Sequence, residues 1–189
     1  MGDMGDTVIL HQELAYEDLL PVAWRQLSTP PDATAVAAIA ERNVKVMQSQ
    51  AALDEAGPVE RPDDNSPNAG DFQRLEVKLN LVLELLGQIV AAGVPRPAAA
   101  TVRFNSRGAS WRMRSPLPAV GDLGCLDIYL GEWIAQPLTL VLKVTAVSAD
   151  GIVTAEAWPP GDAVSDLIER LAFRRHRRRV AGTRQPRRG

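Results

Sequence analysis

The sequence predicts an α+β fold: a small antiparallel β-barrel with two long heptad-bearing helices inserted after its first strand, and a C-terminal helix. Three observations predict it. Short runs of alternating or apolar residues, separated by turn residues, are typical of a small barrel. Two long segments after the first such run combine helix-forming residues with apolar positions three and four residues apart. A further amphipathic segment lies near the C-terminus.

The first unit is the N-terminal segment with the first barrel strand, residues 1–29. The strand is expected at 19–28, where Val22 and Trp24 alternate with their neighbours. Two prolines then break it, and Asp32 is placed to cap the helix that follows.

The second unit is an inserted helical pair over residues 32–93. Its helices are expected at 33–54 and 72–92, and the acidic loop 55–71 between them is rich in proline, glycine and asparagine. In both helices the apolar positions follow the a/d spacing of a coiled coil. A globular helix pair need not keep that spacing over three heptads, so self-association is favoured over packing of the helices on the barrel.

The oligomer seam includes two polar positions, Asn43 and Gln50, which are expected to pair across the helical bundle and fix its register. Val77, Leu81 and Leu85 lie off the stripe, so the second helix is expected to have more than one apolar neighbour. The full seam is Val36, Ile39, Asn43, Val46, Gln50 and Leu53 on the first helix, and Leu75, Leu79, Val82, Leu86 and Ile89 on the second.

The third unit, residues 101–180, supplies the remaining strands and the C-terminal helix. Ala149-Asp150-Gly151 is a hairpin signal, and Asp162 is placed to cap the last helix. Residues 181–189 are expected to be a disordered basic tail. The strand-like runs are 101–113, 123–130, 138–148 and 151–158, and the helix is expected at 162–180.

Charge is distributed unevenly along the chain. Residues 170–189 hold nine arginines and no carboxylate, whereas residues 1–169 hold 12 Lys and Arg against 23 Asp and Glu. The body therefore carries −11 and the end +9. Such a basic block is typical of a segment that meets phosphate, an acidic protein surface or water.

No catalytic or metal-binding constellation is visible, so the chain is predicted not to be an enzyme and to need no cofactor. His11 and His176 are the only histidines and neither has metal-ligand spacing. The single thiol, Cys125, predicts a small buried residue in a reducing cytoplasm. No apolar run is long enough for a membrane span, and the acidic N-terminus lacks the basic region of a secretory signal.

The layout of the chain resembles the PilZ domain. The resemblance rests on LPVAWR at 20–25, the helical insert, NSRGASW at 105–111, the strands that follow, and FRRHRRR at 173–179, and it covers roughly residues 8–180. It implies a six-stranded barrel that binds the bacterial second messenger cyclic di-GMP. The inserted helices resemble those of the atypical PilZ subgroup, which implies a homotetramer, with a dimer as the alternative that the seam also permits.

Both ligand motifs of the family are altered in this sequence. PilZ domains place an Arg-x3-Arg pair before the first strand, but residues 1–23 contain no Arg or Lys, and carboxylates occupy that region. Carboxylates repel a ligand with two phosphates. When the family's Asp/Asn-x-Ser-x-x-Gly motif is aligned on Ser106, Phe104 and Ala109 stand at its two ends, and Gly108 remains from its glycine pair.

Arginines of the last helix are candidates to replace the missing pair. Arg174 with Arg178, and Arg175 with Arg179, stand four residues apart, which places each pair on one helix face. The alternative is a solvated helix end whose charge suits the helix dipole. For Trp111, core packing is the alternative to stacking on guanine. The candidate cyclic di-GMP site is therefore Ser106, Arg107, Gly108, Trp111, Arg174, Arg175, Arg178 and Arg179.

The sequence thus predicts a non-catalytic bacterial signalling module, a PilZ-like cyclic di-GMP receptor or adaptor that self-associates through its helices and acts on an unidentified protein partner. One alternative is an oligomeric scaffold that has lost nucleotide binding. Another is a barrel that binds nucleic acid weakly through its arginine-rich end, which the acidic body and the scarcity of aromatic residues disfavour.

Overall fold

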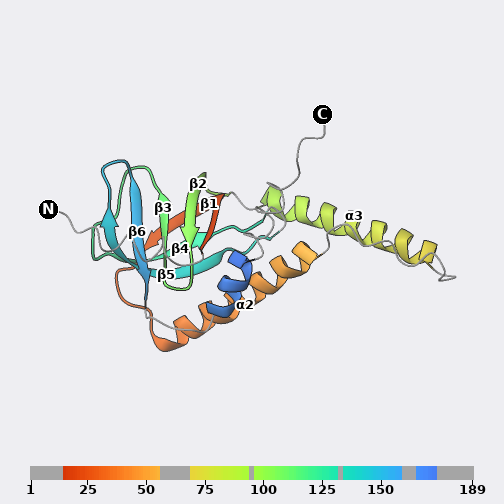
Figure 1. Ribbon diagram of the computed structural model, residues 1–189, viewed down its shortest axis with the longest axis horizontal. Helices are drawn as coiled ribbons and strands as arrows, with labels where there is room; N and C mark the ends of the chain where they lie inside the picture. Colours follow the sequence, from red (N-terminus) through yellow and green to blue (C-terminus); the bar gives the residue numbers. More distant parts are fainter. Residues whose placement is uncertain (1–14, 56–68, 94–95, 132–133, 159–164, 174–189) are drawn as a thin grey trace.

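The computed structural model describes residues 15–55, 69–93, 96–131, 134–158 and 165–173. Figure 1 shows how the elements are arranged. In chain order they are β1 (Tyr16–Gln26), α2 (Ala33–Glu55), α3 (Ala69–Gly93), β2 (Ala99–Phe104), β3 (Gly108–Arg112), β4 (Leu123–Ile128), β5 (Leu138–Val147) and β6 (Ile152–Ala157), followed by helical residues 165–173.

The described strands close into a barrel in the order β1-β2-β3-β6-β5-β4, and every neighbouring pair is antiparallel. The long strand β1 closes the barrel, because it pairs with β2 up to Pro21 and with β4 from Val22 onward. β1 therefore changes its partner strand at Pro21, a residue that has no backbone N–H to donate to a neighbouring strand. The predicted small antiparallel barrel with its inserted helices is confirmed.

Two tight turns join strands of the barrel; only the second, at Ala149-Asp150-Gly151, was predicted, whereas residues 101–113 were predicted as one strand-like run. The run at 101–113 holds two strands, β2 and β3, which pair as a hairpin around residues 105–107. Between β5 and β6, Gly151 adopts a φ of 81° and its N–H donates to the Ser148 carbonyl at 3.1 Å. A positive φ favours glycine, which explains why Ala149-Asp150-Gly151 is a good hairpin signal.

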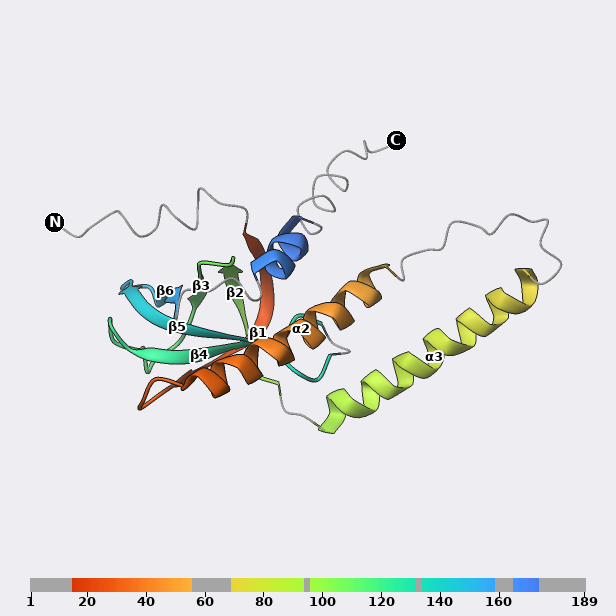
Figure 2. The same ribbon diagram turned by 90° about the horizontal axis from the view of Figure 1, so that it is seen from below.

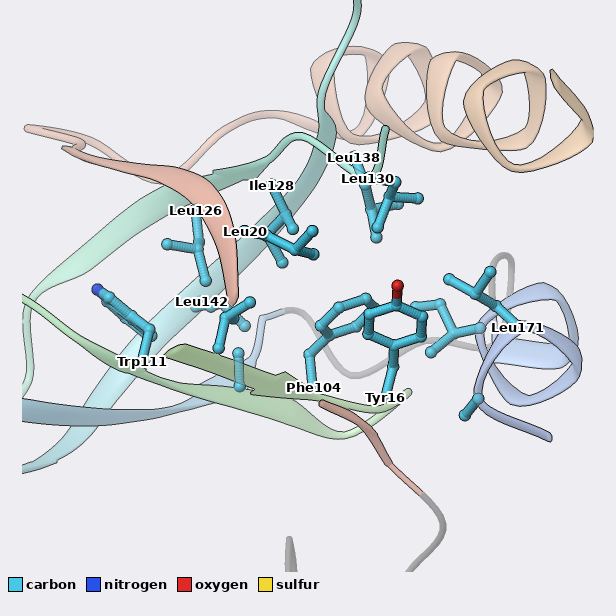
Figure 3. Packing of buried hydrophobic residues seen from close by; sticks show 14 of the residues in the cluster. Tyr16, Leu20, Phe104, Trp111, Leu126, Ile128, Leu130, Leu138, Leu142 and Leu171 are labelled. Carbon is cyan, nitrogen blue, oxygen red and sulfur yellow. The ribbon is translucent and has the colours of Figure 1, made fainter. Parts of the chain in front are cut away.

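Apolar side chains from all six strands fill the barrel (Figure 3). The rings of Tyr16 and Phe104 lie 5.2 Å apart between centroids, and those of Trp24 and Trp111 lie 5.3 Å apart. Helical residues 165–173 bury Ile168, Leu171 and Ala172 in the same core. The C-terminal helix is thus part of the barrel's packing.

Helix α2 packs on its own barrel, which corrects the predicted pairing of Asn43 across a helical bundle. Val46 and Met47 belong to the barrel core. Asn43 is 3 % exposed; its Nδ2 donates to the Thr139 carbonyl at 2.7 Å, and its Oδ1 accepts from the Thr139 N–H at 2.9 Å. The reason lies in the sheet: β6 pairs with β5 only from Leu142 onward, so the Thr139 backbone needs another partner.

The rest of the α2 stripe also points toward the barrel. Val36 and Ile39 line a pocket together with β5 residues. Gln50 is part-buried, and a Cβ on Gly131, in the loop after β4, would come 3.1 Å from its Oε1. The side chain of Leu53 lies outside the described residues. Packing on the barrel, the alternative that the sequence disfavoured, is therefore correct for α2.

Helix α3 has the opposite environment. It projects from the barrel and makes no extensive contact with any other described element (Figures 1 and 2). Neither α3 nor any other helix in the described ranges has the length and apolarity needed to cross a membrane. The large apolar side chains of α3 that the structure describes are 50–69 % exposed, namely Phe72, Leu75, Val77, Leu79, Leu81, Val82, Leu85, Leu86 and Ile89.

Candidate functional site: the Ser106 turn

The turn between β2 and β3 is held by the side chain of Asn105. Its Oδ1 accepts hydrogen bonds from the N–H groups of Arg107 at 2.9 Å and Gly108 at 3.1 Å. The Asn105 N–H in turn donates to the Gly108 carbonyl at 3.0 Å. Asn105 is 3 % exposed, so this is a rigid, buried Asx turn. It holds Ser106, which is part-exposed, and Arg107, which is exposed.

Gly108 serves close packing of strands. A Cβ at this position would collide with the carbonyl oxygen of Ala155 and come 3.1 Å from the Cα of Glu156, both on β6. Strand β3 can therefore approach β6 here only with glycine. This geometry gives Gly108 a structural role in the barrel.

Trp111 lies in the core and not at the turn's surface. It is 2 % exposed and packs against Trp24 across the barrel. The prediction that Trp111 stacks on a guanine base is therefore wrong, because protein covers its ring. Core packing, the alternative, is correct. The strand alternation explains this position: Ala109 and Trp111 point inward, whereas Ser110 and Arg112 point outward.

Two arginines on the strands that flank the turn, one on β2 and one at the far end of β3, are paired with carboxylates. Arg103 Nη1 lies 3.8 Å from Glu17 Oε2, across the β1–β2 ladder. Arg112 Nη2 lies 3.3 Å from Asp150 Oδ2. The pKa of Asp150 is lowered, mainly by its hydrogen bond from the Ser148 hydroxyl and in part by Arg112. A phosphate beside the turn would compete with Glu17 for the Arg103 guanidinium, whereas Arg112 lies at the other end of β3, beside the β5–β6 hairpin.

A pocket of about 150 Å³ lies beside the turn. Lining groups come from α2, β5, the end of β6 and helical residues 165–173; among them are Ser106, Gly108, Trp158 and Ile168. No Lys or Arg stands among the lining residues that the structure describes, and most of the lining is apolar. Drug-sized ligands occupy pockets of roughly 300–1,000 Å³, so a cyclic dinucleotide does not fit inside this one.

The predicted arginine pairs lie outside the described residues, as do His176 and Asp162. The structure therefore brings together Ser106 and Gly108, with Arg107 on the same turn, and leaves their relation to Arg174, Arg175, Arg178 and Arg179 as a prediction. Within the described residues no group of three His, Cys, Asp or Glu side chains is arranged to hold a metal ion. The only cysteine, Cys125, is buried in β4.

Sequence reasoning missed Arg96, which follows α3 closely in the chain. Its Nη1 donates to the Gly131 carbonyl at 2.8 Å and its Nη2 to the Ile134 carbonyl at 3.2 Å. The guanidinium also lies 5.6 Å from the centre of the Tyr129 ring. Arg96 thus ties the segment between α3 and β2 to the loop after β4. Only its place in a proline-rich linker was visible in the sequence, and that gives no signal of a partner.

Comparison with known proteins agrees with this fold. One solved structure, described as a tetrameric PilZ domain from Xanthomonas campestris that self-assembles via an unusual helical bundle, superposes with a TM-score of 0.67. It is 24 % identical, and the alignment covers 89 % of this chain and 90 % of that one. No curated protein matches this sequence. A family model described as "Atypical PilZ domain, cyclic di-GMP receptor" matches residues 47–185, and the chain therefore belongs to the atypical PilZ domain family.

Proposed function

We propose that this chain is a non-catalytic signalling module that self-associates through α3 and presents its PilZ barrel to cyclic di-GMP or to a protein partner. The observation that carries the proposal is the apolar surface of α3, with seam side chains 51–69 % exposed. Soluble monomers rarely leave an apolar patch of this kind open to water. Burying half of each seam side chain is worth about 1 kcal/mol per residue on every helix that joins.

Four copies are the favoured assembly. The Xanthomonas campestris PilZ protein described above is tetrameric and self-assembles via a helical bundle, and its fold matches nine-tenths of this chain. The α3 seam of Leu75, Leu79, Val82, Leu86 and Ile89 keeps the spacing that such a bundle needs, and it contains no polar residue. A dimer would leave more of this helix in water.

Light scattering on size-separated protein tests the assembly. Leu79→Asp with Leu86→Asp should convert the oligomer to a monomer, because each copy would bring two charges into the seam. The matched control is Gln73→Asp with Asn80→Asp, which adds the same charges to the opposite side of α3 and should leave the mass unchanged. A wild-type chain that is monomeric at micromolar concentration would end the proposal.

The nucleotide part of the proposal rests on the family and on the Ser106 turn. The family is described as a cyclic di-GMP receptor, and the turn is pre-formed beside the C-terminal helix that leads to the arginine pairs. We expect isothermal titration to give heat with cyclic di-GMP for the wild type. Arg175→Ala with Arg179→Ala should weaken binding at least tenfold, since two charge-assisted hydrogen bonds of about 1.5 kcal/mol or more would be lost.

A scaffold without nucleotide binding is the second candidate. It is favoured by the small, uncharged pocket beside the turn and by the pairing of Arg103 with the Glu17 carboxylate. Absence of heat in the titration, together with an intact oligomer, would select this candidate and leave only the role of adaptor for a protein partner.

A further inference from the structure

The pocket beside the Ser106 turn has a hydrogen-bond donor in its wall that the protein itself does not use. Asn105 is one of the lining residues and is 3 % exposed. The Nδ2 group of Asn105 is buried and finds no hydrogen-bond partner within the described residues. A buried amide N–H without a partner costs free energy, so nearly all such groups in proteins are satisfied and an exception calls for an explanation.

The turn fixes which way the Asn105 amide faces. Its Oδ1 accepts from the N–H groups of Arg107 and Gly108, so exchanging the amide oxygen and nitrogen would set an NH2 group against two N–H groups. The unpartnered group at the pocket wall is therefore a donor. Asn43, the other amide in the lining, has both its oxygen and its nitrogen engaged by the Thr139 backbone.

The rest of the lining is mostly apolar and carries no charge. Residues from α2, β5 and the C-terminal helix supply it, among them Ile39, Val141 and Ile168. Neither a Lys or Arg nor an Asp or Glu stands among the described lining residues. A charged ligand would lose its hydration here without gaining a partner of opposite charge, so the pocket favours a neutral molecule.

The volume of the pocket limits the size of that molecule. It is about 150 Å³, and the pocket is open to solvent, so a ligand can enter while the barrel stays folded. An apolar cavity of roughly 150 Å³ engineered into another protein holds one benzene molecule. A six-membered ring with a short polar substituent therefore suits the size of this pocket.

We propose that this pocket binds a small neutral molecule that combines an apolar ring with a carbonyl oxygen. The ring packs between α2, β5 and the C-terminal helix (Figure 1), and the carbonyl oxygen accepts a hydrogen bond from Asn105 Nδ2. The site needs neither the arginine pairs nor the assembly through α3, so it goes beyond the function proposed above. It gives the module an input of a different chemical class from cyclic di-GMP.

Two probes of nearly equal shape test the hydrogen bond by NMR titration of the full chain labelled with 15N. Acetophenone has a carbonyl oxygen, and α-methylstyrene has a CH2 group in its place. Acetophenone should shift the side-chain amide resonances of Asn105. Asn105→Asp keeps an oxygen to hold the turn but removes the donor. It should therefore weaken acetophenone binding roughly tenfold and change α-methylstyrene binding by less than about twofold.

Filling the pocket is the second, independent test. Ala40→Phe places a ring in the pocket from α2 and should abolish binding of both probes, whereas Ala38→Phe, at an exposed position of the same helix, should not. Since the two tests use different variants, a chain that fails to fold in one leaves the other decisive.

Four results would overturn the proposal. The first is a wild-type chain that does not bind acetophenone at millimolar concentration, and the second is binding that survives Ala40→Phe. The third is an equal loss of both probes in a folded Asn105→Asp chain. The fourth is displacement of acetophenone by cyclic di-GMP, because a guanine base also offers a ring with a carbonyl oxygen and the pocket would then belong to the nucleotide.

Discussion

Replacement of Asn43 by leucine distinguishes a helix that packs on its own barrel from one that packs on a partner helix. Leucine is close to asparagine in shape, but it can neither donate to the Thr139 carbonyl nor accept from the Thr139 N–H, which Asn43 now does at 2.7 and 2.9 Å. Each orphaned group on the part-buried Thr139 costs about 1 kcal/mol, the low end for buried groups. The free energy of unfolding should therefore fall by about 2 kcal/mol, which lowers Tm by about 4–8 °C for a chain of this size.

Thermal and urea unfolding, followed by circular dichroism at a fixed protein concentration, measure this change. The same comparison in the Leu79→Asp and Leu86→Asp background removes any contribution from assembly. Gln48→Leu, an exposed position on the same helix, is the control and should change the free energy of unfolding by less than about 0.5 kcal/mol. If Asn43→Leu instead raised Tm and broadened the oligomer mass, Asn43 would be a polar position in a helical bundle, and the barrel contact would be refuted.

Three further predictions follow from single contacts. Asp32→Ala should lower the free energy of unfolding by about 1 kcal/mol in urea titrations, because the Asp32 carboxylate caps α2 by accepting from the Ala35 N–H at 2.7 Å; an unchanged midpoint would contradict this. Arg96→Ala should cost about 2 kcal/mol in the same assay, and Arg96→Lys should recover at most half, since a lysine cannot reproduce both carbonyl bonds. Burial raises the pKa of the Cys125 thiol above its ordinary value of 9.0, so the folded protein should not react with DTNB at pH 8. The Cys125 thiol of the unfolded chain loses its proton at a lower pH than that of the folded chain, so this thiol should lower the free energy of unfolding as the pH rises past 9.0. Cys125→Ala should therefore show a smaller fall in stability over that pH range than the wild type.

The barrel could be predicted because its signals are local. Gly151 and its neighbours mark a tight hairpin, and the alternation around Val22 and Trp24 marks a strand with one buried side. The break inside the run 101–113 is also local, since Asn105 forms an Asx turn with its own neighbours. Such features depend on residues within a few positions of each other, so the sequence carries them directly.

Contacts between distant segments could not be predicted in the same way. Asn43 and Thr139 are 96 residues apart, and the need for their contact arises only because β6 pairs with β5 from Leu142 onward. The partners of Arg96 are backbone carbonyls, which every residue has and no sequence pattern marks. At the candidate site, Ser106 was singled out only by the resemblance of its segment to a family motif, and the burial of Trp111 depends on how the barrel closes.

Equal heptad spacing in α2 and α3 leads to opposite environments, and the width and polarity of each apolar surface explain the difference. The α2 stripe is narrow and includes Asn43, whose amide is satisfied by backbone groups at the open end of β5. The described apolar side chains of α3, from Val77 through the seam to Phe72, span about 220° of the helix. One barrel surface can cover a narrow stripe, but an arc of that width needs neighbours on several sides. Spacing alone therefore shows that a helix has a partner, whereas the arc and its polar members indicate whether that partner is the chain's own barrel or another copy.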